Sequence, residues 1–503
     1  MTAPRHPRAV VDVTRADLAE HTGRLLADGH RLALVAAHHD AAGPGRAETI
    51  RIVYLFIAGP PDRRTELHLR VDADHPHIPS LAALSFPAGR FEREMHDLYG
   101  VNPDDHPLPR RLVRHPHWPA GWYPMRHDAG PPPAFAGTEP FPFLTVAGPG
   151  VYEIPVGPVH AGLIEPGHFR FSVVGETILK LKARLWYVHK GTEKLFEHHP
   201  ATDRVALAER ISGDTAVGHA LAYSLAVEDA LGWAVDPHAQ RVRAVLLELE
   251  RLHNHVADIG ALCNDVGYGI AHTHAQRIRE TLLRLNQHTT GHRLLRGGIY
   301  PGGAHLHTVP GPAAIQAIAD DITEVADLAL HHTVVHDRFA GTAVLAPAQA
   351  AGIGTLGYVA RASGVAADAR TAHPFTDVGD LAIATHTSGD VLARFLVRAA
   401  EISTSTAILR RLLPTLAAQP TEVRPVPPSP AGGVAGVGIV EGWRGAITHR
   451  VETGPDGILT RVKIVDPSFL NWPALPVALA DTIVPDFPLA NKSFNLSYAG
   501  NDL

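Results

Sequence analysis

The spacing of hydrophobic residues predicts a small α/β unit in residues 8–128. A helix is expected from Thr14, its N-cap, to Ala27, because leucines recur on one of its faces. Three β-like segments, rich in Val, Ile and Leu and separated by Gly, Pro and Asp, follow at 31–37, 49–57 and 66–71. One helix and at least three strands therefore open the chain.

Prolines separate this unit from the rest of the chain. Residues 129–145 contain Pro131, Pro132, Pro133, Pro140 and Pro142. Proline at this density cannot form a helix or a central strand. The segment is therefore predicted to be an extended linker.

Residues 146–503 are predicted to be mainly α-helical, with small β elements at both ends. Helical periodicity is present at 240–260, 275–285, 313–332 and 390–413, and the last helix is expected to stop before Pro414. Segments 436–440, 446–452 and 458–465 have the pattern of a short antiparallel meander, with a strong turn signal at 453–457. The predicted fold class is α+β.

Composition narrows the class of protein. The 503 residues are 45% hydrophobic and 19% charged, which is typical of a globular chain of two or three domains. A net charge of −6 at pH 7 gives no basis for nucleic-acid binding. The single cysteine, Cys263, excludes an internal disulfide. Neither a secretory signal nor an apolar stretch long enough to span a bilayer is recognisable, so membrane association is expected only through partners.

Two further kinds of site are not expected. The glycine-rich segments lack a phosphate-binding frame, so direct nucleotide binding is not predicted. Among the 34 histidines, some close pairs are two residues apart, a spacing that does not place both rings on one helical face. Examples are His115/His117, His253/His255 and His272/His274. No metal site is expected from them.

Two short segments carry the most specific signal in the chain. Residues 210–215 read Arg-Ile-Ser-Gly-Asp-Thr, and residues 466–471 read Asp-Pro-Ser-Phe-Leu-Asn. They resemble the Arg-x-Cys-Gly-x-Cys and Asp-Pro-Cys-x-x-Cys signatures of [NiFe]-hydrogenase large subunits, which we call the first and second frames. The cysteine positions are held by Ser212, Thr215, Ser468 and Asn471. The resemblance is to a hydrogenase-type scaffold without its thiolates, as in the catalytic-core subunit of respiratory complex I.

Other segments support the same resemblance. Residues 91–101, which include Asp-Leu-Tyr-Gly, together with the following His-Pro and paired arginines resemble the complex I 30-kDa-type subunit, a docking module. The alternative for that segment is an ordinary helix that ends at Gly100 with solvated acidic residues. Residues 157–170, 187–194 and 247–260 resemble elements shared by the 49-kDa-type subunit and the hydrogenases. The fusion of both regions is similar to formate hydrogenlyase-type large subunits and to some bacterial complex I subunits.

The resemblance implies a quinone site beside a 4Fe–4S cluster held by a partner subunit. His168 lies where the family has a hairpin histidine, and Asp265 lies where a carboxylate supports it. Imidazole can deliver a proton near neutral pH as a quinone is reduced. The family's tyrosine aligns with Gly213, which cannot donate the phenol hydrogen bond. The alternative for His168 and Asp265 is a structural hydrogen-bonded pair.

The resemblance also implies roles for residues around the first frame. Arg210 and His219 are expected to face the partner's cluster, with an interface ion pair as the alternative for Arg210. The vacated metal cavity is expected to be lined by Ser212, Gly213, Asp214, Thr215, Ser468 and Asn471. Their oxygens are suited to ordered water or, less well, to a hard cation.

Three functions are consistent with these residues. The first is a core subunit of a membrane-associated, complex-I-like oxidoreductase that passes electrons to a quinone-like acceptor and binds no cofactor of its own. The second is a non-catalytic scaffold that couples an iron–sulfur subunit to membrane proton-pumping subunits. The third, a nickel-binding hydrogenase, conflicts with the missing thiolates. The implied partners are a small iron–sulfur subunit, a ferredoxin-like subunit and antiporter-like membrane subunits, at the cytoplasmic side of the membrane.

Overall fold

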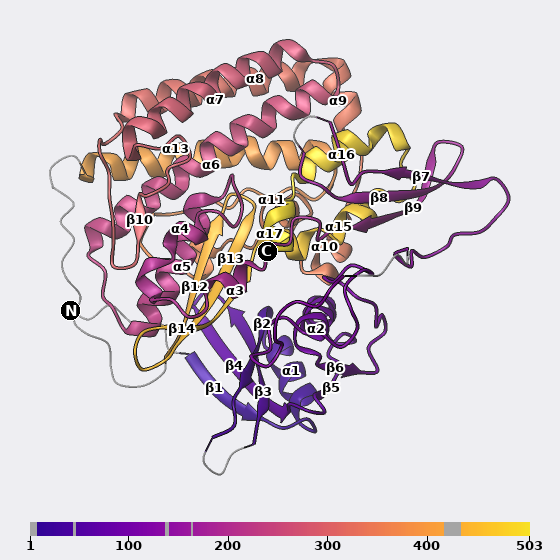
Figure 1. Ribbon diagram of the computed structural model, residues 1–503. Helices are drawn as coiled ribbons and strands as arrows, with labels where there is room; N and C mark the ends of the chain where they lie inside the picture. The colour runs from indigo at the N-terminus through magenta and orange to yellow at the C-terminus, as the bar shows by residue number, and fades with distance from the viewer. Residues whose placement is uncertain (1–7, 44–46, 136–139, 162–163, 417–433) are drawn as a thin grey trace.

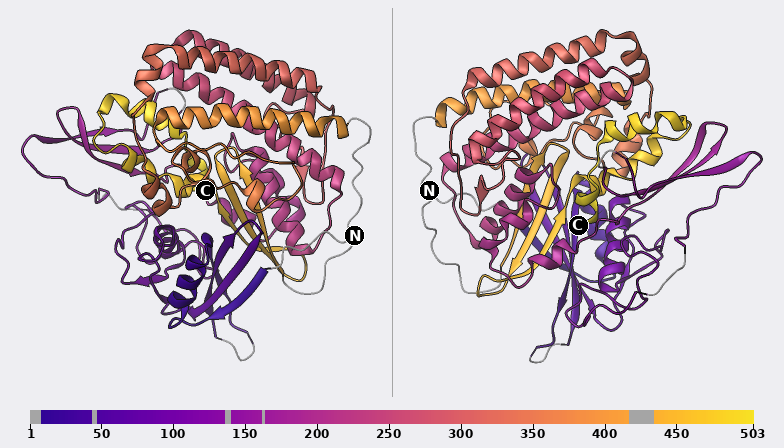
Figure 2. Two further views of the ribbon diagram at one scale, coloured as in Figure 1. Left: turned by 180° about the vertical axis from the view of Figure 1, so that it is seen from behind. Right: turned by 45° about the horizontal axis from the view of Figure 1, so that its top comes forward.

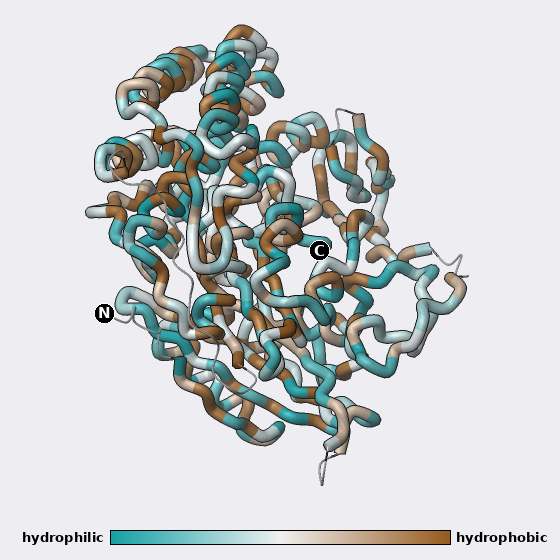
Figure 3. The backbone as a smooth tube through the Cα atoms, turned by 60° about the vertical axis from the view of Figure 1, so that its left-hand side comes forward, coloured by the Kyte–Doolittle hydropathy of each residue, from teal (hydrophilic) through white to brown (hydrophobic). Residues whose placement is uncertain are grey.

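The computed structural model describes residues 8–43, 47–135, 140–161, 164–416 and 434–503. Its α+β architecture, an N-terminal sheet followed by a mainly helical body, confirms the predicted fold class (Figure 1). None of the helices in these ranges is long and apolar enough to cross a membrane. Hydrophobic and hydrophilic residues instead alternate along the long helices (Figure 3).

The N-terminal unit is a four-stranded sheet covered by two helices. Its strands are β1 (Arg8–Val13), β2 (Arg31–Asp40), β3 (Thr49–Ala58) and β4 (Arg63–Asp72), in the order β1-β4-β3-β2. β1, which was not predicted, pairs parallel to β4, and the other pairs are antiparallel. The helices are α1 (Leu18–Ala27) and α2 (Phe86–Tyr99), and the short strands β5 (His77–Pro79) and β6 (Asn102–Asp104) form a separate parallel pair.

Two details of these helices correct the sequence interpretation. Thr14 is not an N-cap, because α1 begins at Leu18 and the Thr14 N–H donates to the Asp17 carboxylate (2.7 Å). α2 ends at Gly100 as expected, with φ +79°, but its acidic residues are not solvated. Asp97 is fully buried and accepts the backbone N–H of Leu112 and of Val113 (both 2.7 Å).

The helical body packs around a second sheet. β12 (Val434–Gly442), β13 (Gly445–Thr453) and β14 (Leu459–Val465) form the predicted antiparallel meander, and α5 (Ala216–Leu231) lies across β12. The predicted long helices are α6 (Pro237–Asp265), α7 (Gly269–Thr290), α8 (Pro312–His331) and α13 (Val391–Leu416). Contrary to expectation, Pro414 lies inside α13.

A third, three-stranded antiparallel sheet projects from the body in both views of Figure 2. It consists of β7 (Val151–Val156), β8 (His168–Val174) and β9 (Thr177–Arg184). The shorter helices are α3 (Thr192–Phe196), α4 (Val205–Ala208), α9 (Thr333–Phe339), α10 (Pro347–Ile353), α11 (Gly357–Ala362), α12 (Ala369–Ala372), α14 (Pro467–Asn471), α15 (Ala474–Ala478), α16 (Phe487–Phe494) and α17 (Tyr498–Asp502). The remaining elements are the β10–β11 pair (Ile299–Tyr300, Gly303–Ala304) and 3₁₀ turns at Ala201–Asp203 and Val484–Asp486.

The N-terminal unit contacts the helix that carries the second frame. The Phe91 ring of α2 packs on the Phe469 ring of α14 with centroids 4.9 Å apart, and the Arg90 guanidinium lies 4.7 Å from the centroid of the same ring. Lys463 of β14 forms an ion pair with Glu94 of α2 (2.7 Å). The N-terminal unit is therefore part of the packing that holds the second frame in place. Residues 129–135 and 140–145, the described part of the predicted linker, contain no helix or strand.

Candidate functional site

The two frames lie at the starts of two helices. Ser212 and Thr215 precede α5, while Ser468 and Asn471 lie on α14. α14 begins at Pro467, because Asp466 caps it by accepting the Ser468 N–H (2.7 Å) and Pro467 fills its first turn. All four side chains at the former cysteine positions are buried.

A single residue, Ser497, joins the two frames. Its hydroxyl bonds to the Ser212 hydroxyl (2.8 Å), and its backbone N–H donates to the Ser468 hydroxyl (3.0 Å). The same Ser497 hydroxyl accepts the Gly500 N–H (2.9 Å) and so caps α17. The frames are therefore joined through a third segment of the chain, which sequence reasoning did not identify.

The other two positions are also engaged by protein atoms. Asn471 accepts the Leu356 N–H (2.8 Å) and donates to the Leu356 carbonyl (3.1 Å). The Thr215 hydroxyl donates to Asp214 (3.1 Å) and accepts the indole N–H of Trp443 (3.1 Å). Each former ligand position thus has polar partners within the protein.

A cation lies beside the first frame. Arg444, in the tight turn between β12 and β13, donates to both carboxylate oxygens of Asp214 (2.6 and 2.7 Å) and to Thr215 (3.2 Å). Its guanidinium lies 3.9 Å from the centroid of the Trp443 ring. Removal from water opposes ionisation of Asp214, but the Arg444 charge and hydrogen bonds from Arg444, Ser212 and Thr215 lower its pKa to about 2. Asp214 and Arg444 therefore form a charged pair at neutral pH.

This donor set does not fit a nickel–iron centre. Such a centre takes soft thiolates, whereas the four positions offer hydroxyl and amide groups. The positive charge of Arg444 also lies among them. The four side chains are hydrogen-bonded within the protein, and Arg444 balances the charge of Asp214.

His219 does not lie where a partner's cluster could contact it, which corrects the expectation for that residue. Its side chain is fully buried, with Nε2 bonded to Asp466 (3.0 Å) and Nδ1 bonded to His449 (3.0 Å). Burial and the nearby His219 ring keep the pKa of His449 well below its ordinary value. Because a carboxylate only accepts, Nε2 of His219 carries the hydrogen of its bond to Asp466.

Arg210, by contrast, is exposed and bonds only to the Ala206 carbonyl of its own turn among the contacts of the described residues. Its guanidinium is therefore available to a partner. Gly213 is exposed too, and a Cβ added to it would meet no atom within 4 Å. The position that the family fills with tyrosine has room for a side chain.

His168 and Asp265 do not form the expected pair. His168 begins β8 and its Nδ1 bonds to the Gly157 carbonyl (2.9 Å), whereas Asp265 ends α6 and forms an ion pair with Lys492. A carbonyl only accepts, so Nδ1 carries the hydrogen and Nε2 is the nitrogen that can exchange a proton. Gly157 thus fixes the tautomer of His168, a role that the sequence assigned to Asp265.

The hairpin that carries His168 approaches the segment that joins the frames. Gly167 packs so closely on the Tyr498 ring that an added Cβ would lie 2.5 Å from it. Glu165 accepts the Ala499 N–H (3.1 Å). The base of the hairpin and the Ser497 junction therefore belong to one region of the molecule.

Glu250 is a further ionisable residue near the first frame that sequence reasoning did not single out. Its buried carboxylate accepts the N–H of Val217 (2.7 Å) and of Gly218 (2.9 Å) in the first turn of α5. Burial raises the pKa of Glu250 to about 8, against the effect of these two hydrogen bonds.

Comparisons with known proteins show the family to which the chain belongs. Residues 11–133 match the model of the respiratory-chain NADH dehydrogenase 30-kDa subunit, and residues 265–431 match that of the 49-kDa subunit. Residues 190–263 match the nickel-dependent hydrogenase model. Formate hydrogenlyase subunit 5 of Escherichia coli K12 is 33% identical, covering 87% of this chain and 79% of that protein.

Two further relatives extend the comparison. The fused C/D subunit of NADH-quinone oxidoreductase from Bacteroides thetaiotaomicron is 30% identical, covering 84% of each protein. A solved chain of the membrane-bound sulfane sulfur reductase, an archaeal respiratory membrane complex, superposes with a TM-score of 0.64 at 26% identity, over 70% of this chain and 98% of that chain. The protein described here belongs to the family of fused 30-kDa- and 49-kDa-type subunits that includes formate hydrogenlyase subunit 5 and the C/D subunits of NADH-quinone oxidoreductase.

Proposed function

We propose that this chain is a core subunit of a membrane-associated, complex-I-like oxidoreductase that reduces a quinone-like acceptor without a nickel–iron centre. The observation that carries the proposal is the site at the two frames, where hydroxyl and amide groups replace all four thiolates and Arg444 pairs with Asp214. The kinship with NADH-quinone oxidoreductase subunits supports the reaction type.

In this function His168 assists protonation of the acceptor. Reduction of a quinone to a quinol consumes two electrons and two protons, and the electrons would come singly from an iron–sulfur cluster in a partner subunit. The tautomer fixed by Gly157 leaves Nε2 of His168 to deliver a proton to a reduced carbonyl oxygen. Arg210, exposed beside the first frame, is proposed to face that cluster, where a fixed cation favours the reduced state.

The proposed partners are a small iron–sulfur subunit, a ferredoxin-like subunit and antiporter-like membrane subunits. These would hold the chain at the cytoplasmic face of the membrane as a peripheral subunit. The solved relative comes from a respiratory membrane complex, which supports assembly of this kind. No nucleotide or nucleic acid is proposed as a ligand of this chain.

A scaffold function is the second candidate. It is favoured by the incomplete quinone site, in which glycine stands at the tyrosine position and Asp265 pairs with Lys492 instead of His168. A scaffold would keep the contacts of Arg210 with the iron–sulfur subunit and need no turnover at His168. The two candidates therefore predict different results for variants of His168.

Assembly can be tested by affinity purification of the chain from membranes of its natural host. We expect it to co-purify with a cluster-bearing subunit, and Arg210→Ala to weaken that association while Arg277→Ala, a change at an exposed arginine of α7, does not. If the chain fractionates as a free monomer while its presumed partners stay in the membrane, the function as part of a complex is wrong.

The metal content of the same complex gives a separate prediction. Because four oxygen- or nitrogen-bearing side chains hold the thiolate positions, we expect no stoichiometric nickel and no iron beyond the partners' clusters. Elemental analysis measures both metals, and hydrogen-dependent dye reduction measures hydrogenase activity. Stoichiometric nickel together with dye reduction would contradict the prediction.

A further inference from the structure

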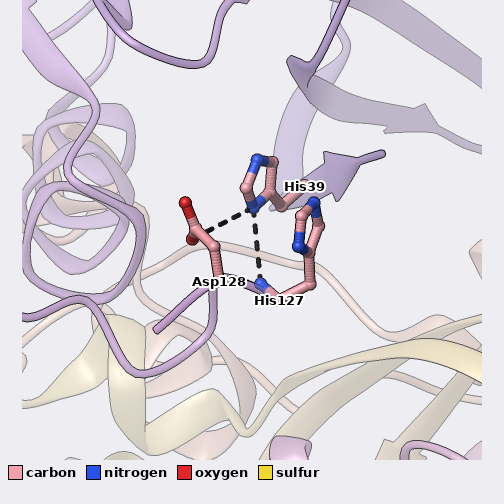
Figure 4. A group of neighbouring side chains, drawn as sticks. All are labelled: His39, His127 and Asp128. Atoms are coloured by element: carbon pink, nitrogen blue, oxygen red, sulfur yellow. Dashed lines mark hydrogen bonds and ion pairs between the residues drawn. The ribbon is translucent and has the colours of Figure 1, made fainter. Parts of the chain in front are cut away.

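Two histidines and two carboxylates meet at one edge of the N-terminal unit, far in sequence from either frame. His39 lies near the end of β2, while His127 and Asp128 lie at the start of the proline-rich segment (Figure 4). One ring nitrogen of each histidine and one oxygen of Asp128 lie within 4.8 Å of one another. Glu48, which immediately precedes β3, lies at the opposite edge of the two rings.

The separations between these atoms are too long for good hydrogen bonds. His39 Nδ1 lies 3.6 Å from Asp128 Oδ1 and accepts only a long bond from the His127 backbone N–H (3.3 Å). His39 Nε2 is buried and has no hydrogen-bond partner among the residues that the structure describes. Two ligand atoms that each lie about 2.0–2.2 Å from a tetrahedral zinc ion are roughly 3.4 Å apart. The His39–Asp128 separation is close to that value.

Two carboxylates lie beside the rings. Arg126 donates to both oxygens of Asp128 (each 2.9 Å), so an ion bound to Asp128 would share that carboxylate with a guanidinium. Glu48 faces Nε2 of His39 (3.7 Å) and of His127 (3.4 Å).

We propose that His39, His127 and Asp128 bind one Zn²⁺ ion. The two imidazoles bind through Nδ1, Asp128 supplies one oxygen, and water takes the fourth position. Glu48 places a carboxylate beside the Nε2 atoms of both rings, as carboxylates commonly lie around zinc-bound histidines. The ion ties the start of the proline-rich segment to the end of β2.

Binding requires one defined movement. The two rings are stacked, with centroids 3.7 Å apart and planes 8° from parallel, so their in-plane lone pairs do not meet at one point. His127 has a side chain that is 40% exposed and is free to tilt toward Asp128, whereas the His39 side chain is 1% exposed and stays in place. Zinc would therefore replace the stack and the long His127–His39 hydrogen bond.

The test is zinc titration of the full-length chain, purified without a histidine tag. Calorimetry is expected to give one tight site per chain, and Co²⁺ in its place is expected to show the intense visible bands of a tetrahedral ion. His127→Ala removes one ligand, and Asp128→Asn removes the charge of another. Each variant is expected to bind zinc about tenfold or more weakly than the unaltered chain. His75→Ala changes another exposed histidine of the same unit and serves as the control.

Equal zinc affinity in His127→Ala, Asp128→Asn and His75→Ala, or no stoichiometric binding to the unaltered chain, would overturn the proposal. His39→Ala is not the primary variant, because the buried ring also packs in the fold. The site is separate from the two frames. Nickel bound by the unaltered chain would therefore be assigned to the His39–His127–Asp128 site if His127→Ala lacks it, and to the frames if His127→Ala retains it.

Discussion

Replacement of His168 by alanine is expected to lower quinone-linked turnover of the assembled complex by about 10²–10⁴-fold, the usual contribution of general acid–base assistance. The physical reason is the tautomer fixed by Gly157, which leaves Nε2 as the only ring nitrogen of His168 able to transfer a proton. Turnover should be measured with a quinone acceptor in membranes or in the purified complex.

His160→Ala provides a matched control in the same hairpin. The His160 ring also bonds to a backbone carbonyl, that of Gly167 (2.7 Å), but it holds no proposed position in the quinone site. We expect this variant to retain turnover. An intact complex with unchanged turnover in His168→Ala would favour the scaffold function, and equal losses in both variants would indicate a disturbed hairpin.

A second large effect is expected from Arg361→Met. The guanidinium of Arg361, 1% exposed, donates to Glu401 of α13 (2.9 Å) and to Glu441 of β12 (2.8 Å), and so joins three elements of the body. Methionine would leave two buried carboxylates without this partner, which is expected to lower the free energy of unfolding by about 3–5 kcal/mol. Urea unfolding followed by the helical circular dichroism signal measures the change.

The control for this variant is Arg277→Met, which removes an ion pair with Asp321 whose side chains are 58% and 49% exposed. Surface pairs of this kind contribute about 0–1 kcal/mol. The buried arginine has no special role in stability if both variants unfold at the same urea concentration.

Acid should lower the stability of the protein, as Arg361→Met does. The Arg361 charge and the His255 hydrogen bond hold the pKa of Glu401 well below its ordinary value despite burial, so its stabilisation is present above the unfolded pKa and is lost as pH falls.

Local sequence patterns were sufficient to predict most helices and strands of the fold. The periodicity of 240–260 and the alternation of 446–452 reflect which side chains face the core, and α6 and β13 follow them. β1 was missed because a short, half-exposed edge strand has little pattern of its own and depends on pairing with β4. Pro414 lies inside α13, although a proline removes the hydrogen bond to the carbonyl four residues earlier, and the local pattern did not indicate that the helix continues past it.

The candidate site was predictable only in part. The frames and their missing thiolates are visible in the sequence, but Ser497 and Arg444 reach them from distant segments, 285 and 230 residues from the groups they contact. The resemblance placed His168 in the hairpin and did not reveal that a backbone carbonyl, rather than Asp265, fixes its ring. Contacts of this kind depend on tertiary packing that no local pattern records.

The hydrogen bonds of Asn471 oppose its replacement by the cysteine of the hydrogenase signature. A cysteine there would forfeit both hydrogen bonds to the buried backbone of Leu356. Each such loss costs roughly 1–3 kcal/mol. A cysteine at Thr215 would likewise remove a neutral acceptor from Trp443 while Arg444 remained beside it. Introducing a cysteine at either position alone would therefore weaken the protein before any bound metal could compensate.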